Sequence, residues 1–165
     1  MNYESFCVDA QRALEEVETF LTNNAISSLT PDHLCYKCAS HDEFLSIRTM
    51  LEKESVYLYE SWISGRLIAV LKLQQPLETS FGTIAYIELQ DKKQGSGTIS
   101  GFTHIEFFPK DGNYDAALKV LVSRGLDVIA DPTPHHPIHE IKLSDQFVFR
   151  LEHEPVINKI KREEL

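Results

Sequence analysis

The sequence has little cysteine and no stretch typical of export or membrane insertion. Three cysteines stand in 165 residues, an odd, low count that does not form a disulfide framework and that suits a reducing compartment. The N-terminus lacks the basic segment and apolar core of a signal peptide, and no apolar run approaches the ~20 residues of a membrane span. We therefore expect a cytoplasmic protein with no membrane partner.

Positive charge is also scarce. The chain has 16 Lys and Arg against 25 Asp and Glu, which gives a net charge of −9. The richest basic stretch, Lys159 to Arg162, is followed at once by Glu163 and Glu164. Nucleic-acid binding depends on clustered Lys and Arg, so we expect no nucleic-acid partner. The expected ligand is a small molecule, bound by a monomer or a homodimer.

The hydrophobic pattern predicts that one series of elements occurs twice. A hydrophobic fraction of 42% in 165 residues fits one domain, or two half-size modules that share a core. Each half is predicted to contain a strand, a helix and three further strands. One such module leaves a sheet edge open and one face half covered, whereas two modules side by side bury both and leave a cleft. The predicted fold class is α+β, with two βαβββ modules and an extra N-terminal helix.

The predicted boundaries follow from hydrophobic period and from turn residues. We divide the chain into an N-terminal helix and loop (1–28), a first module (29–90), a linker (91–100), a second module (101–155) and a C-terminal helix (156–165), all in one structural domain. Helices are predicted at 3–22, 41–54 and 114–124. Strands are predicted at 33–39, 56–62, 67–73, 83–89, 102–108, 126–130, 138–143 and 146–153, with a loop at 74–80 that contains Pro76.

Alternate side chains of a strand share a face, and this alternation selects four polar residues. His33 and His104 lie in the first strand of each module, and Glu88 and Glu152 lie in the last. Two imidazoles and two carboxylates offer mixed ligation and neutralise a 2+ charge, which suits Zn, Ni, Mn or Fe better than Ca or Mg. The pattern predicts a divalent metal ion bound by all four, with Glu88 or Glu152 as a candidate catalytic base.

Four segments carry a resemblance to a known family: Asp32–Cys38, Glu60–Leu73 followed by Pro76, Ile87–Leu89 and Gly101–Phe107. They are similar to the YecM family of the vicinal oxygen chelate superfamily, which includes glyoxalase I, extradiol dioxygenases, epimerases and antibiotic-resistance proteins. The resemblance covers roughly residues 28–155. It implies a glyoxalase-like fold and places His33, Glu88 and His104 at superfamily metal positions.

This resemblance implies a metal-dependent isomerase, lyase or dioxygenase that acts on a small substrate with vicinal oxygens. A non-catalytic protein of the same fold that binds a small molecule or a metal is the alternative. The fourth ligand stays open, because Glu152 matches the final-strand Glu of the superfamily whereas the YecM pattern has a His near the adjacent His153. Strand alternation favours Glu152.

Four further charged residues are predicted to line the cleft. Arg66 and Lys72 either hold an anionic substrate there or are exposed charges at the edge of the sheet. Glu106 is expected to pair with Arg150 or Lys37, or else to act as a general base. The candidate substrate residues are therefore Arg66, Lys72, Glu106 and Arg150.

Two other clusters have metal-like spacing. Cys35 and Cys38 are three apart in a predicted strand, so they face opposite sides and are expected to pack in the core rather than to chelate a metal. His135, His136 and His139 lie in and beside a proline-bounded loop. We expect this loop to border the cleft, and a separate zinc site there is the weaker alternative.

Overall fold

The computed structural model describes residues 1–95, 97, 99–131 and 138–163. None of the helices in this part of the chain combines the length and apolarity needed to cross a membrane. The elements in chain order are α1 (Tyr3–Asn23), β1 (Leu29–Lys37), α2 (His41–Lys53), β2 (Ser55–Ile63), β3 (Arg66–Thr79), β4 (Gly82–Gln90), β5 (Gly101–Pro109), α3 (Tyr114–Ser123), β6 (Ile129–Asp131), β7 (Ile138–Lys142), β8 (Val148–Leu151) and α4 (Val156–Glu163).

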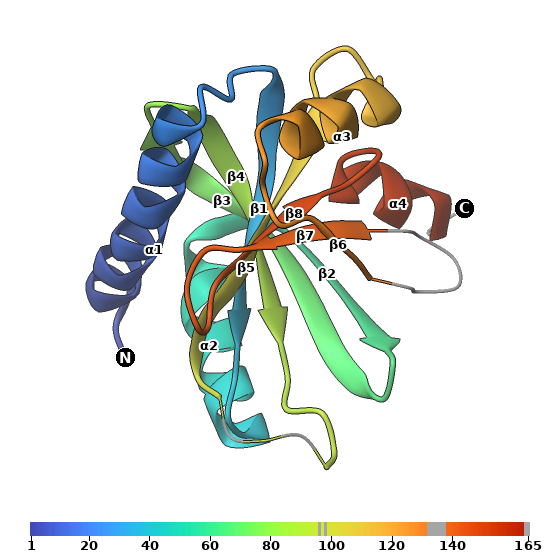
Figure 1. Ribbon diagram of the computed structural model, residues 1–165. Helices are drawn as coiled ribbons and strands as arrows, with labels where there is room; N and C mark the ends of the chain where they lie inside the picture. The colour runs from blue at the N-terminus through green and yellow to red at the C-terminus, as the bar shows by residue number, and fades with distance from the viewer. Residues whose placement is uncertain (96, 98, 132–137, 164–165) are drawn as a thin grey trace.

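One mixed sheet of eight strands runs through the molecule (Figure 1). Its order is β2-β3-β4-β1-β5-β8-β7-β6, so the two halves have the same order when each is read outward from the centre. In each half the first strand is parallel to the last, β1 to β4 and β5 to β8, and the antiparallel pair β1–β5 joins the halves. The predicted fold class, α+β with two βαβββ modules and an N-terminal helix, is confirmed.

Helices α1, α2 and α3 pack on one face of this sheet and form the main core with it. The apolar stripe of α1 is buried as its helical period predicts: Phe6, Ala10, Leu14, Val17 and Leu21. These side chains belong to one cluster with sheet residues such as Leu34, Ile87, Ile105 and Phe149. Each large apolar side chain buried in this way contributes about 1.5–3 kcal/mol, and this fixes which face of each strand is turned away from the helices.

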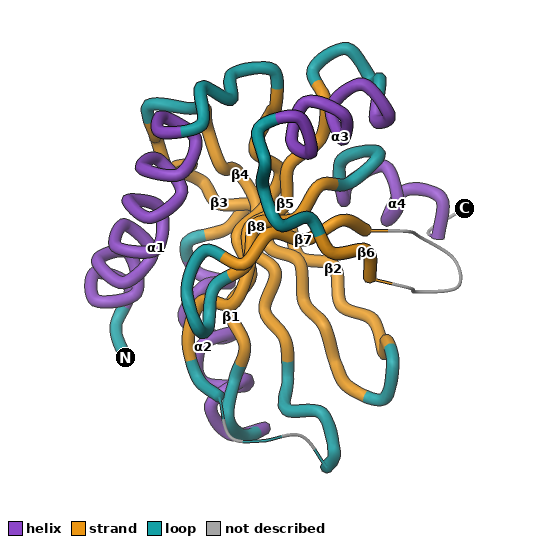
Figure 2. Tube along the Cα trace, in the orientation of Figure 1, coloured by secondary structure: helices purple, strands orange, loops and turns teal. Residues whose placement is uncertain are grey.

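Helix α4 packs on the opposite face. Along β3, Ala69 and Leu71 belong to the main core, whereas Val70 between them forms a separate cluster with Val156 and Ile160 of α4. Neighbouring residues of a strand point to opposite faces, so α4 lies across the sheet from α1. Figure 2 shows α1 and α4 on opposite sides of the strands. The C-terminal helix therefore covers the face on which the predicted polar site lies.

The prediction of a loop at 74–80 is wrong, because strand β3 continues to Thr79. Its pairing with β4 moves from Lys72–Tyr86 to Leu77–Ile84, so β3 has extra residues at this point. Pro76 falls in that irregular stretch, where its missing N–H breaks no regular ladder bond. The last strand is shorter than predicted and ends at Leu151.

Candidate metal centre

Glu88, Cys35 and His104 lie side by side on three adjacent strands. Cys35 of β1 pairs with Glu88 of β4 on one side and with His104 of β5 on the other. Paired residues of neighbouring strands share a face of the sheet, and the Cys35 thiol donates a hydrogen bond to Oε1 of Glu88 at 3.3 Å. The joint between the two modules thus brings together one carboxylate and one imidazole that are distant in sequence.

His33 lies on the same face as Cys35 because the pairing of β1 with β4 is regular from His33 to Lys37, whereas the pairing with β5 has one extra residue just before it. The pairing with β5 moves from Pro31–Phe107 to Leu34–Ile105, so Asp32 and His33 together lie opposite a single residue. A bulge of this kind re-aims side chains. Asp32 and His33 are both buried, and Nδ1 of His33 donates to Oδ2 of Asp32 at 2.9 Å. The bulge therefore brings the Asp32 carboxylate beside the imidazole that it orients.

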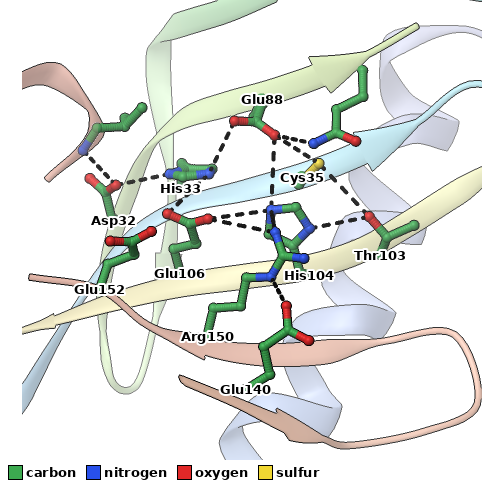
Figure 3. Close-up of polar contacts among 12 residues, drawn as sticks. Asp32, His33, Cys35, Glu88, Thr103, His104, Glu106, Glu140, Arg150 and Glu152 are labelled. Atoms are coloured by element: carbon green, nitrogen blue, oxygen red, sulfur yellow. Dashed lines mark hydrogen bonds and ion pairs between the residues drawn. The ribbon is translucent and has the colours of Figure 1, made fainter. Parts of the chain in front are cut away.

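Two imidazoles and two carboxylates converge around one point of the sheet (Figure 3). Nε2 of His33 lies 3.7 Å from Oε2 of Glu88 and 3.8 Å from Oε2 of Glu106. Nε2 of His104 lies 3.9 Å from Oε1 of Glu88 and 3.6 Å from Oε1 of Glu106. These gaps exceed hydrogen-bond length. A tetrahedral site with bonds of about 2.1 Å separates its ligand atoms by about 3.4 Å, so gaps of this size suit a divalent cation, and His33, Glu88 and His104 are close enough together to share one.

The Nε2 atom of His33 is buried without a hydrogen-bond partner among the described residues. A buried polar atom in this state costs about 1–3 kcal/mol, which marks a place for a ligand. Burial acts to lower the pKa of His33. The charges of Glu106, Asp32 and Glu88, with the hydrogen bond to Asp32, outweigh burial and raise the pKa to about 10. The carboxylates therefore favour a positive charge here, whether a proton on His33 or a metal ion.

His104 is held as a neutral imidazole. Nη1 of Arg150 donates to Nε2 of His104 at 3.0 Å, which leaves the ring proton on Nδ1, 3.4 Å from Oγ1 of Thr103. Burial lowers the pKa of His104 well below its usual value, and the charges of Arg150, His33 and Arg66 lower it further. Neutral imidazole is the form that binds a metal, but a metal on Nε2 would take the place of Arg150.

Glu106 and Glu152 have different surroundings. The Glu106 carboxylate contacts both imidazoles, lies 3.8 Å from Arg150 as its predicted ion pair requires, and has a pKa raised to about 7 by burial. Glu152 is buried just beyond β8, with Nζ of Lys159 2.9 Å from its Oε2. Among the described residues the ligand groups close enough to share an ion are His33–Glu88–His104 and Asp32–His33–Glu106. Glu152 as fourth ligand stays a prediction, and Glu106, whose carboxylate lies 3.8 Å from Nε2 of His33 and 3.6 Å from Nε2 of His104, is a second candidate.

The predicted substrate residues do not all point to the site. Nη2 of Arg66 donates to Gln90 at 3.0 Å, and Gln90 donates in turn to Glu88, so Arg66 is linked to the site through one amide. Lys72 is exposed, with its ammonium 5.9 Å from the Tyr86 ring centre. Arg150 binds Glu140 at 2.6 Å in addition to contacting His104.

The remaining sequence candidates differ in their distance from this group. Cys35 and Cys38 are both buried free thiols, and Cys38 packs in the main core, whereas Cys35 lies between Glu88 and His104. His153 is exposed and its ring stacks on Tyr114 at 3.6 Å. His139 lies in β7, where its Nδ1 is 2.6 Å from the Tyr114 hydroxyl. The other two members of the histidine cluster, His135 and His136, lie outside the described residues.

A pocket of about 150 Å³ lies over the site, between the sheet and α4. His33, Glu88 and Glu106 line it together with residues of β2, β3 and α4: Tyr59, Ile63, Ile68, Val70, Val156, Lys159 and Ile160. Sequence reasoning missed the role of α4 and the role of Asp32. The apolar pair Val156 and Ile160, four apart on a predicted helix, and an acid directly before a candidate ligand are the signals that pointed to them.

Fold and site together define a class of protein: an α+β domain of two βαβββ modules with a buried cluster of histidines and carboxylates at their joint. The model of the YecM protein family matches residues 1–143. The chain therefore belongs to the YecM family, as its sequence resemblance implied. No curated protein sequence matches the chain significantly.

Solved structures are similar to this chain to different extents. A protein described as "Structural Genomics, Protein EC4020" is 21% identical, with a TM-score of 0.78 over 98% of this chain and 92% of that chain. A Streptomyces coelicolor methylmalonyl-CoA epimerase is 21% identical, with a TM-score of 0.49 over 75% and 96% of the two chains. A 4-hydroxymandelate synthase of the same organism is 11% identical, with a TM-score of 0.40 over 84% and 56%. The first of these similarities shows a shared fold.

Proposed function

We propose that this protein is a divalent-metal-dependent enzyme of the vicinal oxygen chelate type that acts on a small molecule with two adjacent oxygens. The observation that carries the proposal is the buried Nε2 of His33, which has no hydrogen-bond partner in the described part of the chain and faces two carboxylates at 3.7 and 3.8 Å. The sequence resemblance supports the same assignment. The reaction type, isomerase, lyase or dioxygenase, follows from the resemblance alone.

The proposed ligands are His33, Glu88 and His104, with Glu106 as the fourth in preference to Glu152. Two imidazoles and two carboxylates suit Zn, Ni, Mn or Fe. Asp32 accepts the Nδ1 proton of His33 and so directs Nε2 toward the site, as the outer partner of a metal-bound histidine does. If Glu152 is the ligand instead, its contact with Lys159 must open first.

Such a metal ion supplies a Lewis acid that polarises a substrate oxygen. The residues around it supply the rest of the chemistry. Glu152, paired with Lys159 and near Glu106, is the proposed proton acceptor for a carbon acid, and Glu88 is the alternative base. The apolar side chains of β3 and α4 lower the polarity of the pocket, which strengthens these charge interactions.

One contact favours the second candidate, a non-catalytic binding protein. The Arg150 guanidinium donates to Nε2 of His104 at 3.0 Å. The nitrogen that would bind a metal therefore already accepts a hydrogen bond from a positively charged side chain. If the protein is such a binding protein, the site holds a small anion directly, through Arg150 and a protonated His33. Substituting Arg150 with Met separates the two candidates: metal affinity rises if Arg150 competes with a metal, and anion binding falls if Arg150 is the binding group.

Metal titration of the purified protein tests the proposal. After chelator treatment, calorimetry with Zn²⁺, Ni²⁺, Mn²⁺ and Fe²⁺ is expected to show one tight site and a raised melting temperature. His33→Ala and His104→Ala are expected to abolish binding. The exposed His153→Ala is the matched control and is expected to bind as wild type. If no metal binds, the metal proposal is wrong. If metal binds but a panel of small oxygenated substrates is returned unchanged, the binding protein is favoured.

A further inference from the structure

The pocket over the candidate metal site has a largely apolar wall. Five of its lining side chains are aliphatic: Ile63, Ile68, Val70, Val156 and Ile160. They come from β2 and β3 on one side and from α4 on the other, and Val70, Val156 and Ile160 are in mutual contact. This wall faces the charged floor formed by His33, Glu88 and Glu106. A ligand that fills the pocket must therefore have a polar end and an aliphatic end.

The size of the pocket limits the ligand. Its volume of about 150 Å³ holds about five water-sized groups, each of which takes ~30 Å³ in the liquid. Sites for drug-sized molecules are larger, about 300–1,000 Å³. Helix α4 bounds the pocket on one side through Val156, Lys159 and Ile160. The volume beneath the helix therefore suits short-chain compounds better than long acyl chains.

Lys159 supplies a positive charge to the pocket, opposite the carboxylates of Glu88 and Glu106. Its ammonium lies 2.9 Å from Oε2 of Glu152, and its side chain remains 22% exposed. An ammonium has three donors, so one contact with Glu152 leaves others for a ligand. Lys159 stands three residues after Val156 and directly before Ile160, which places its charge beside the aliphatic wall rather than on the solvent face of α4.

We infer that the pocket takes a small organic anion with a short aliphatic group, whose carboxylate pairs with Lys159 and whose carbons pack against Val70 and Ile160. The neighbouring oxygen of the same molecule then faces the metal group, so this inference rests on the proposed function for its metal contact. Lys159 and the aliphatic wall belong to the chain itself and act with or without a metal.

Titration with a homologous series tests the inference. Zn²⁺-loaded protein is titrated by calorimetry with glycolate, lactate, 2-hydroxybutyrate and 2-hydroxyoctanoate, and with propane-1,2-diol as the neutral analogue of lactate. Affinity is expected to rise from glycolate to 2-hydroxybutyrate and to fall at least tenfold for 2-hydroxyoctanoate and for the diol. A flat series, or equal binding of the diol, overturns the inference.

Variants of the charged pair make the test specific. Glu152→Gln removes the carboxylate that competes for Lys159, so lactate is expected to bind several-fold more tightly. The double variant Glu152→Gln, Lys159→Met loses both charges without leaving either buried alone, and lactate affinity is expected to fall at least tenfold below that of Glu152→Gln. Lys161→Met, on the exposed side of the same helix, is the control and is expected to match wild type. Equal affinity of the single and double variants overturns the role of Lys159.

Two alanine variants of α4 test the limit on the length of the ligand. Ile160→Ala enlarges the pocket and is expected to shift the preferred chain to a longer one, whereas Ile157→Ala, outside the pocket lining, leaves the preference unchanged. The same titrations on metal-free protein separate this inference from the proposed function. If Zn²⁺ does not bind but lactate binding still depends on Lys159, the metal proposal fails and the anion site stands. If Zn²⁺ binds and no anion in the series does, only the anion inference fails.

Discussion

Asp32 and Val156 are 124 residues apart in the chain, yet the backbone N–H of Val156 donates to Oδ2 of Asp32 at 2.8 Å. The same oxygen accepts the Nδ1 proton of His33. Because Val156 is the first residue of α4, Asp32 provides a carboxylate at the N-terminus of that helix, where negative charge is stabilising. One buried oxygen thus orients a candidate metal ligand and anchors the helix that covers the pocket.

Replacing Asp32 is expected to weaken metal binding without removing a ligand atom. Asp32→Asn keeps the size of the side chain but removes the charge that orients His33, and outer partners of this kind are worth ~10–100-fold in metal affinity. Val156→Pro removes the N–H that Asp32 accepts, at a helix position where proline is tolerated, and leaves the Asp32–His33 contact in place, although it also alters the apolar contact with Val70 and Ile160. It should speed hydrogen exchange in α4 and cost less metal affinity than Asp32→Asn. Wild-type calorimetry for Asp32→Asn would contradict the coupling.

Two isosteric substitutions, Glu106→Gln and Glu152→Gln, distinguish the two candidates for the fourth metal ligand. Glu106→Gln is expected to reduce Zn²⁺ affinity by more than ~100-fold, above the range for outer partners, because the Glu106 carboxylate contacts both imidazoles. Glu152→Gln is expected to change it less than tenfold, because that carboxylate contacts Lys159. Calorimetry with both variants at equal pH measures the difference. A larger loss of Zn²⁺ affinity in Glu152→Gln than in Glu106→Gln would identify Glu152 as the fourth ligand, as strand alternation predicts.

Metal affinity is expected to rise with pH. Metal binds neutral imidazole, whereas the pKa of His33 in the metal-free protein is about 10, so binding near neutral pH displaces a proton. Apparent affinity should increase about tenfold per pH unit between roughly pH 7 and 9. Calorimetry in buffers of different ionisation enthalpy counts the released proton. A pH-independent affinity would show that His33 is not a ligand.

The metal-free protein should show the opposite trend in stability. The folded-state pKa of His33 lies above its usual value of 6.5, so the stabilising contribution of this group is complete below pH 6.5 and is lost as pH rises toward 10. Melting temperatures of wild type and His33→Gln are therefore expected to converge as the pH is raised. A difference that grows with pH would contradict this assignment.

The three thiols should differ in reactivity. Burial raises the pKa of Cys35 and of Cys38, and nearby carboxylates raise both further, so little thiolate forms at pH 8. Cys7 on α1 is only partly buried. Iodoacetamide under native conditions is expected to modify Cys7 first, and all three after denaturation, as read by mass spectrometry. Early modification of Cys35 would indicate that the pocket opens in solution.

Much of the fold was predictable because it depends on local patterns. The helical stripe from Phe6 to Leu21 and the repeated order of elements both appear in the structure. Alternation along regular strands also places Glu88 and His104 on one face, where Cys35 lies between them. The loop predicted around Pro76 was wrong. A proline usually marks the end of a strand, whereas here an irregular stretch of β3 accommodates it.

The sequence by itself determined which residues are available: two histidines and two glutamates at matching places in a repeated module, with too little cysteine and positive charge for other classes of site. Only the tertiary structure decided how they meet. Alternation already places His33 on the face of Cys35, but the extra residue of β1 brings Asp32 beside it, and no alternation rule describes a strand at its bulge. The position of α4 depends on contacts with Val70 and Asp32, which lie far away in sequence, so its place over the site came from packing rather than from any local pattern.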